Sequence, residues 1–298
     1  MEIEDVSRLV DRAFEIDDPT ELETLGKERP AALTPFHLRL ADSEFRWVAD
    51  LYRAMSEETA AELIRRLDAD DDPDGLLHML AAGATATAFR HEPVGRLSHA
   101  GSWERTPSGA VRRLSSAVAV ALTPGSPAVS GGRLGECGWC GFPMWRLLDV
   151  PRASLPDLFG SGPGQIVIAT CTLCGSYATI FNDSAGRFVA FAERPAAIPG
   201  KWAPHELDGL PDAPALGLGA ARPSPFAGNA WEEGGSTLGG SPQWIQDPEF
   251  PSCPRCSETM PFVGMVTGGD LWADYGEGCF YLFHDAGCGL SAVVYQQS

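Results

Sequence analysis

Seven of the eight cysteines in this 298-residue chain follow a repeating spacing. Three pairs have the form Cys-x-x-Cys, and one more cysteine follows the last pair: Cys137 with Cys140, Cys171 with Cys174, Cys253 with Cys256, and Cys288. Two thiolates with two residues between them on a tight turn point at one ion, and two such turns supply the four tetrahedral ligands that zinc prefers. The spacing therefore predicts two zinc ribbons.

The second predicted site has three cysteines and needs a fourth ligand. The candidates near its last cysteine are His284, Asp285 and Cys279. Aligning Cys288 on Cys174 places Asp285 opposite Cys171. We predict His284, because imidazole is a common zinc ligand and a turn closes the His-x3-Cys spacing, with Asp285 and Cys279 as alternatives.

If Cys279 is not a ligand, its place in a strand decides its surroundings. Side chains alternate between the two faces of a strand, which puts Cys279 on one face with Tyr281 and Phe283. A free thiol there behaves as a small apolar side chain.

Cys-x-x-Cys pairs have two other uses in proteins. Disulfides need an oxidising compartment, but residues 1–5 carry neither a basic nor an apolar leader, so we expect a cytoplasmic protein. A thioredoxin-like redox pair begins a helix after a strand, whereas Gly follows Cys140 and Cys174, which favours a turn between strands. We call a turn that carries two metal ligands a knuckle. A thiol oxidoreductase or redox sensor that uses Cys253 and Cys256 is the alternative function, because the knuckle that would pair with theirs contains only one cysteine, Cys288.

The elements that must position these cysteines repeat along the chain. Cys253 follows Cys137 by 116 residues, and Cys288 follows Cys174 by 114. An apolar, β-prone run precedes the second knuckle of each copy, at 166–168 and at 280–283. Each unit is predicted to run knuckle, strand, loop, strand, knuckle, strand.

The N-terminal part of the chain has a different period. Apolar residues recur at helical spacing over residues 1–90, and Asp18-Pro-Thr-Glu21 is a helix start. Trp47 and Tyr52 fit the predicted helical core. Residues 198–240 are rich in Pro, Gly and Ala and are predicted to form loops.

These patterns predict an α+β fold in three parts. The parts are an acidic helical region at 1–90, a β-rich unit with the first zinc ribbon at 91–200, and a β-rich unit with the second at 201–298.

Charge and composition limit the partners. The formal net charge is −18, and the only lysines are Lys27 and Lys201, so a phosphate-neutralising surface for nucleic acid is not expected. No apolar run approaches the length of a membrane span. An acidic chain suits a basic protein partner by electrostatic steering.

Sequence patterns of catalysis are missing. The chain has no Gly-x-Ser-x-Gly, no P-loop and no His-Glu-x-x-His. A site with four thiolates is closed and leaves no coordination position for a reacting water. We therefore expect a protein that is not an enzyme.

The second ribbon resembles a known family. Its ordered motifs are Gly239-Gly240-x-Pro242-x-Trp244, the Cys253 pair, and an aromatic strand at 278–283 that leads to a further cysteine. This order resembles the YwqG-like family of bacterial proteins of unknown function, and it is similar to eukaryotic programmed cell death protein 2. The resemblance covers 236–298 well and 130–182 more weakly.

The resemblance implies a β-rich fold of two related halves and a role in binding other proteins. The eukaryotic relatives are regarded as chaperones of a ribosomal protein, and bacterial relatives are associated with toxin–immunity loci. We therefore predict a non-catalytic zinc-binding protein-interaction module, immunity-protein-like or chaperone-like, whose partner is a toxin or a ribosomal protein.

Overall fold

The computed structural model describes residues 2–298 except 126, 160, 192, 199, 201–213, 227 and 272–277. The chain divides into two compact units, Met1–Leu114 and Ser115–Ser298. Helices make up most of the first unit and antiparallel strands most of the second, so the predicted α+β class is confirmed. Within the described residues, no helix combines the length and the apolar character needed to cross a lipid bilayer.

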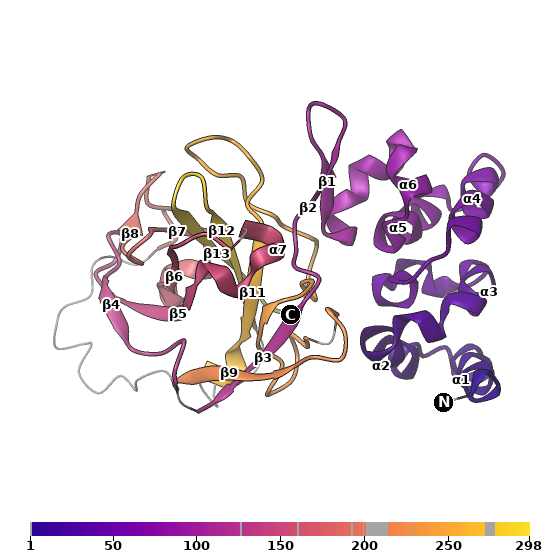
Figure 1. Ribbon diagram of the computed structural model, residues 1–298, viewed down its shortest axis with the longest axis horizontal. Helices are drawn as coiled ribbons and strands as arrows, with labels where there is room; N and C mark the ends of the chain where they lie inside the picture. The colour runs from indigo at the N-terminus through magenta and orange to yellow at the C-terminus, as the bar shows by residue number, and fades with distance from the viewer. Residues whose placement is uncertain are drawn as a thin grey trace. The chain divides into compact units, whose positions relative to one another are not determined.

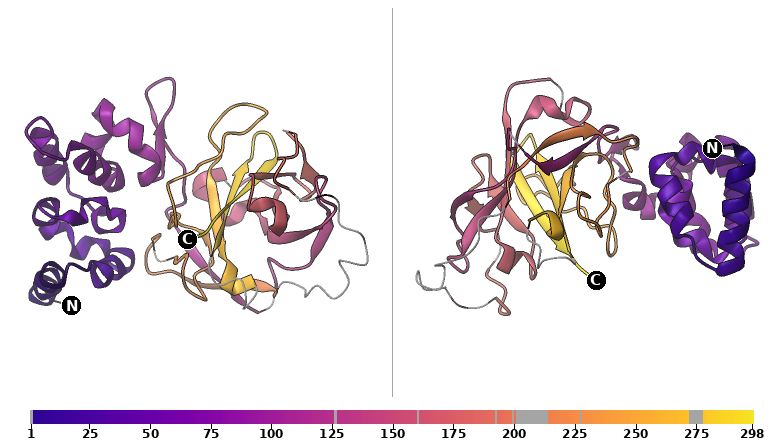
Figure 2. Two further views of the ribbon diagram at one scale, coloured as in Figure 1. Left: turned by 180° about the vertical axis from the view of Figure 1, so that it is seen from behind. Right: turned by 90° about the horizontal axis from the view of Figure 1, so that it is seen from below.

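Short helices form the first unit. They are α1 (Ile3–Ile16), α2 (Thr20–Glu28), α3 (His37–Ala41), α4 (Glu57–Arg66), α5 (Pro73–Gly83) and α6 (Ala86–Arg90), with single 3-10 turns at Pro30–Ala32, Thr34–Phe36, Glu44–Trp47 and Ala49–Tyr52. Figure 1 shows them stacked in succession, from α1 and α2 through α3 to α4 and α5, and Figure 2 shows the same stack from two further sides.

Local sequence determines where these helices begin. The predicted helix after Asp18 is observed, but it begins at Thr20 with Pro19 as its N-cap, one residue later than predicted. The Asp18 carboxylate accepts hydrogen bonds from the backbone N–H and the hydroxyl of Thr20 at 2.9 and 2.6 Å. Ser56 is the N-cap of α4 and accepts from the N–H of Thr59 at 3.1 Å. These bonds satisfy N–H groups that have no partner within the helix.

The first unit extends further along the chain than predicted. After residue 90 the chain forms a 3-10 segment, η5 (Glu92–Gly101), and a hairpin of β1 (Trp103–Arg105) and β2 (Val111–Arg113). Trp103 is fully buried in the helical core, and its indole N–H donates to the carbonyl of Ala81 at 3.1 Å. Because this core needs Trp103, the boundary lies after Leu114 and not at residue 90.

Two antiparallel sheets form the second unit. The larger has the order β8-β7-β13-β12-β11-β10-β3-β9, and the smaller has the order β4-β5-β6. In chain order the strands are β3 (Ala119–Pro124), β4 (Arg133–Glu136), β5 (Pro143–Pro151), β6 (Gln165–Thr170), β7 (Ile180–Asp183), β8 (Phe188–Val189), β9 (Leu216–Ala221), β10 (Thr237–Gly239), β11 (Phe262–Thr267), β12 (Cys279–Asp285) and β13 (Leu290–Gln296).

The two predicted β-rich halves share one sheet. β7 comes from the first half and β13 from the second, and they pair antiparallel with Ala292 opposite Phe181. The element order of the halves agrees with the predicted repeat: β5, α7 (Pro156–Phe159), β6 and β7 in the first, and β11, α9 (Gly268–Leu271), β12 and β13 in the second. The halves are therefore related in order but fold as one unit.

The stretch predicted as loop contains two strands. β9 and β10 lie in the larger sheet, one at its edge beside β3 and the other between β3 and β11, while residues 201–213 lie outside the described part. A Cβ at Gly217 would lie 2.9 Å from the carbonyl oxygen of Pro127, so the glycine permits close backbone approach. A prediction from composition alone assigns such a glycine-rich strand to a loop.

Alternation along β12 sends its side chains into two separate layers. Phe280 and Leu282 join a core shared with the smaller sheet. Tyr281 and Phe283 face the opposite way, where the Trp244 indole stacks on the Tyr281 ring at 4.6 Å between centroids. The ring of Phe250 completes this layer, 5.7 Å from Phe283.

Candidate metal centres

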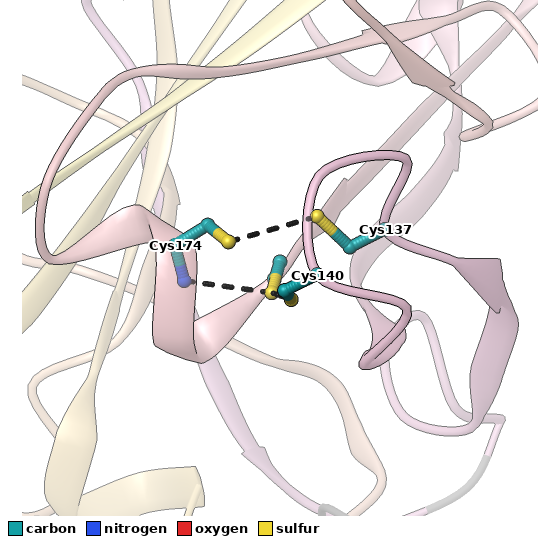
Figure 3. A group of neighbouring side chains, drawn as sticks. Cys137, Cys140 and Cys174 are labelled. Carbon is teal, nitrogen blue, oxygen red and sulfur yellow. Dashed lines mark hydrogen bonds between the residues drawn. The ribbon is translucent and has the colours of Figure 1, made fainter. Parts of the chain in front are cut away.

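The first cysteine cluster lies where two strand ends meet. Cys137 and Cys140 lie on the turn between β4 and β5, and Cys171 and Cys174 lie where β6 runs into the short helix α8 (Thr172–Gly175). Figure 3 shows Cys137 and Cys140 facing the helical turn that carries Cys174. The four predicted residues are brought together as expected from their spacing.

The distances between the sulfur atoms fit one tetrahedral ion. The Sγ atoms of Cys137 and Cys174 are 3.8 Å apart, and those of Cys140 and Cys171 are 3.6 Å apart. A zinc ion with bonds of about 2.3 Å needs its thiolates about 3.8 Å from one another. All four ligand atoms lie within 4.8 Å of one another.

Backbone hydrogen bonds shape each turn of the first cluster. The N–H of Gly141 donates to the carbonyl of Cys137 at 2.8 Å, and the N–H of Gly175 donates to the carbonyl of Cys171, also at 2.8 Å. Gly141 has a φ of +75°, a conformation that glycine adopts without cost. The pair at 171 and 174 opens a helical turn after a strand, so the expectation of a simple turn between strands is wrong there.

The four cysteines of the first cluster are buried, and their thiols contact one another. Hydrogen bonds with the thiols of Cys171 and Cys174 hold the pKa of Cys137 far below its usual value. The same hydrogen bonds hold the pKa values of Cys171 and Cys174 above their usual range. A second and third thiolate in this buried place need a cation to balance their charge.

The second cluster contains Cys253, Cys256, Cys288 and Asp285, with their ligand atoms within 4.8 Å of one another. Cys253 and Cys256 lie on the loop before β11, Asp285 is the last residue of β12, and Cys288 lies on the turn between β12 and β13. The Cys253 turn repeats the Cys137 turn, because the N–H of Ser257 donates to the carbonyl of Cys253 at 2.7 Å.

The carboxylate of Asp285 stands where the first cluster has the thiolate of Cys171. Oδ1 of Asp285 accepts the N–H of Cys288 at 3.0 Å, as Sγ of Cys171 accepts the N–H of Cys174 at 3.5 Å. Oδ2 of Asp285 lies 3.0 Å from Sγ of Cys256 and is left to face the thiols. Asp285, and not His284, therefore completes this group of four possible ligands.

The structure places His284, the predicted fourth ligand, outside this cluster. The residues before and after His284 on β12 face away from the smaller sheet, whereas His284 itself faces the smaller sheet. Its Nδ1 is 3.0 Å from the hydroxyl of Ser291, and its ring lies edge-on to Phe159 at 5.5 Å. Burial lowers the pKa of His284 to about 4, which keeps the ring neutral at neutral pH.

Cys279, the other alternative, lies at the far end of β12 and outside both clusters. It is fully buried, and burial raises the pKa of its thiol above the usual range. It acts as the small apolar side chain that alternation predicts.

Charge within the second cluster resides on the carboxylate. Burial disfavours ionisation of Asp285, but hydrogen bonds from the thiols of Cys253 and Cys256 and from the N–H of Cys288 outweigh it and hold the pKa of Asp285 well below its usual range. The pKa of the Cys256 thiol is raised, chiefly by its hydrogen bond to Asp285. A metal ion would displace the thiol protons.

The donor sets of both clusters fit a metal ion. The first offers four thiolates, and the second offers three thiolates and one carboxylate, which are ligands that zinc accepts in tetrahedral sites. Each set supplies four protein donors, so neither leaves a position for substrate. The two clusters thus have the composition and spacing of closed metal sites.

A pocket in the first unit was not predicted from the sequence. Its volume is about 360 Å³, and its lining includes Asp42, Glu44, Arg46, Trp47, Asp70, Asp71 and Asp72. Trp47 was expected in the core, but 53% of its surface is exposed here, whereas Tyr52 is fully buried as expected. Helical spacing does not distinguish the two aromatic residues, because the short 3-10 turns change the direction of the chain between them.

Comparisons with known proteins give one curated relative. The protein of Salmonella typhimurium (strain LT2) named "Uncharacterized protein YpfL" is 31% identical over 271 residues, which cover 79% of this chain and 62% of the relative. This chain therefore spans less than two thirds of that protein's length. No family model matches the chain, and no solved structure matches it. The resemblance to the YwqG-like family and to programmed cell death protein 2 stays a prediction.

Proposed function

We propose that this chain is a non-catalytic zinc protein whose two metal ions brace a β-rich unit and whose helical unit receives a basic protein partner. The observation that carries the proposal is the closed donor set of both clusters, with four protein ligands each. Zinc in such sites contributes folding free energy, on the order of 10 kcal/mol, and does no chemistry.

The location of the clusters supports a bracing role. Each cluster connects a loop before one strand with the end of another strand. A metal ion would therefore join residues that are 31 to 37 positions apart in the first cluster and 29 to 35 apart in the second. In the second half, the loop that carries Cys253 also covers Tyr281 and Phe283 through Trp244 and Phe250. Fixing this loop keeps the aromatic layer closed.

The acidic pocket in the first unit supports a basic partner. Arg46 already forms an ion pair within the pocket, because its Nη1 lies 2.5 Å from Oδ1 of Asp70. Glu44 and Asp71 are exposed and form no ion pair with the described residues. The exposed indole of Trp47 offers a flat face on which a guanidinium or ammonium group stacks.

The cysteines also support a reducing, cytoplasmic location within this proposal. All eight cysteines are free, and the two clusters need their thiols reduced in order to bind metal. A toxin and a ribosomal protein are both basic partners of the proposed kind, and an immunity role and a chaperone role remain the two forms of the proposal.

Elemental analysis tests the metal half of the proposal. Protein produced under reducing conditions is expected to contain two zinc ions per chain, with seven thiols masked until a chelator is added and Cys279 masked by burial. A folded, metal-free preparation with a reactive low-pKa thiol would favour the redox alternative.

Copurification from the native host tests the partner half. A basic protein that binds the wild-type chain should be lost when Glu44→Lys and Asp71→Lys are combined. Glu232→Lys with Glu233→Lys is the matched control, because both residues are exposed, lie outside the pocket and give the same change in charge. Equal binding by the two double variants would contradict the assignment of the pocket.

A further inference from the structure

The two clusters differ in how far their sulfur atoms are exposed. All four cysteines of the first cluster are buried, with Cys137 the most exposed at 2%. In the second cluster only Cys253 is buried, while Cys256 is exposed and Cys288 is partly exposed. An oxidant from solvent therefore reaches a ligand sulfur in the second cluster but not in the first.

The clusters also differ in one donor. Asp285 supplies a carboxylate oxygen where the first cluster has a thiolate, and a borderline-soft ion such as zinc binds thiolate more strongly. Oδ1 of Asp285 is occupied by the N–H groups of Gly287 and Cys288, at 2.9 and 3.0 Å, so only Oδ2 remains for the ion. The second ion is therefore held by three sulfurs and one weaker donor.

We propose that the second cluster is an oxidant-responsive metal site, which loses its ion when hydrogen peroxide oxidises its thiolates, while the first cluster keeps its ion. This inference rests on the proposed function, because it requires both clusters to hold zinc. It adds a sensing activity that a purely structural pair of metal sites would not have.

The chemical step begins at the exposed sulfur. The thiolate of Cys256 attacks the peroxide O–O bond, which gives a sulfenic acid at Cys256 and releases water after one proton is taken up. A second thiolate of the same site, from Cys253 or Cys288, attacks the sulfenic sulfur, and a second water leaves after another proton is taken up. Two thiolates have then lost two electrons to the peroxide, and the resulting disulfide no longer binds zinc.

Loss of the second ion has a defined structural consequence. The loop of Cys253 and Cys256 then loses its metal tie to Asp285 and Cys288 and keeps the hydrogen bond from Arg255 to the carbonyl of Cys288, at 2.6 Å. The covering ring of Phe250, three residues before Cys253 in the sequence, packs against Phe283 and Trp244. Oxidation is therefore expected to loosen the cover over the aromatic layer without unfolding the first cluster.

The test uses the full chain loaded with zinc. Hydrogen peroxide is added stepwise in the presence of a chromogenic zinc indicator, and release of one zinc ion per chain is expected, together with a disulfide within the second cluster by mass spectrometry. Release of both ions together, or of neither under peroxide that oxidises free thiols, would overturn the inference. A chain that never binds two ions would instead contradict the proposed function.

Two variants separate donor strength from exposure. Asp285→Cys gives the second cluster four sulfur donors without changing its location in the fold. A chelator should therefore remove the ion of this cluster more slowly, at a rate closer to that of the first cluster. Cys279→Ser is the matched control, since Cys279 lies outside both clusters, and its release of one ion under peroxide should equal that of the wild type. An Asp285→Cys chain that loses zinc to the chelator as fast as the wild type would remove the donor argument.

Discussion

At the scale of single residues, one position in a strand decides the second metal site. His284 and Asp285 are neighbours, yet one lies beside Ser291 and the other beside Cys256. Imidazole is the more common zinc ligand, but ligand chemistry has no influence when the side chain lies on the wrong face of the sheet. Geometry therefore outweighs chemical preference at this position.

The two neighbours should respond differently to truncation. Asp285→Ala is expected to reduce the zinc content from two ions per chain to about one, because it removes a donor. His284→Ala should keep both ions and lower stability by about 2 to 4 kcal/mol through the cavity it leaves. Elemental analysis with denaturant unfolding separates the two, and a loss of zinc in His284→Ala would restore the histidine as a ligand.

A buried histidine in the first unit makes stability depend on pH. His37 is fully buried against the ring of Tyr52, and burial lowers its pKa from 6.5 to about 4. The unfolded chain binds a proton at His37 below pH 6.5, whereas the folded chain does not until about pH 4. The stability that the neutral ring supplies is therefore complete above pH 6.5 and is lost as pH falls towards 4.

Replacing His37 tests this dependence. In His37→Leu the loss of stability between pH 6.5 and pH 4 should be smaller than in the wild type by about 3 kcal/mol, because the titrating group is gone. Helical circular dichroism during denaturant unfolding at several pH values measures it. His99→Leu is the comparison variant, because it removes a second histidine of the first unit whose pKa is lowered by burial. Parallel curves for wild type and His37→Leu would contradict the assignment.

At the scale of elements, the metal clusters join the ends of strands. The first cluster links the turn between β4 and β5 to the turn after β6, next to a small apolar core with Phe142, Met144 and Ile180. The Asn182 side chain adds a link between β6 and β7, because its amide donates to the carbonyl of Ala169 at 2.8 Å. The smaller sheet therefore has a candidate metal site and these hydrogen bonds in addition to the apolar core that it shares with the larger sheet.

Removal of one ligand from the first cluster should destabilise this sheet. Cys140→Ser is expected to lose one zinc ion and to destabilise the second unit by several kcal/mol, up to about 10. Cys279→Ala should keep both ions and cost only about 1 kcal/mol, because it removes one buried atom outside the clusters. Thermal unfolding with zinc analysis compares the two, and equal losses would show that the first cluster does not brace the sheet.

At the scale of the whole molecule, the two units obtain their stability in different ways. The first unit has a continuous apolar core that includes Leu22, Leu40, Leu63, Leu80 and Trp103, and it has no metal cluster among its described residues. The second unit has both clusters. The chain therefore combines a unit with a continuous apolar core and a unit that adds two candidate metal sites to its core.

Chelation should separate the units. A strong chelator under reducing conditions is expected to lower the melting temperature of the β-rich unit and to leave the helical transition unchanged, because only the former contains the clusters. Circular dichroism reports the helical transition, and near-ultraviolet signals from Trp145 and Trp244 report the other. A single transition that shifts as a whole would show that the units unfold together.

The sequence by itself determined the chemistry of the clusters and the class of fold. Cysteine spacing is a local property, because two residues on one turn point at one ion whatever surrounds them, so the first cluster was predicted in full. The helix that follows Asp18 and the repeated order of strands are equally local.

Only the tertiary structure decided the fourth donor of the second cluster, the boundary after Leu114 and the exposure of Trp47. Each depends on which face of an element packs against a distant segment. Phe250 and Trp244 cover the face of Tyr281 and Phe283, and this contact places the Cys253 loop on the side of Asp285. The sequence predicts the alternation of side chains along β12. It does not predict on which side the Cys253 loop packs, because that side is determined by contacts between residues far apart in the chain.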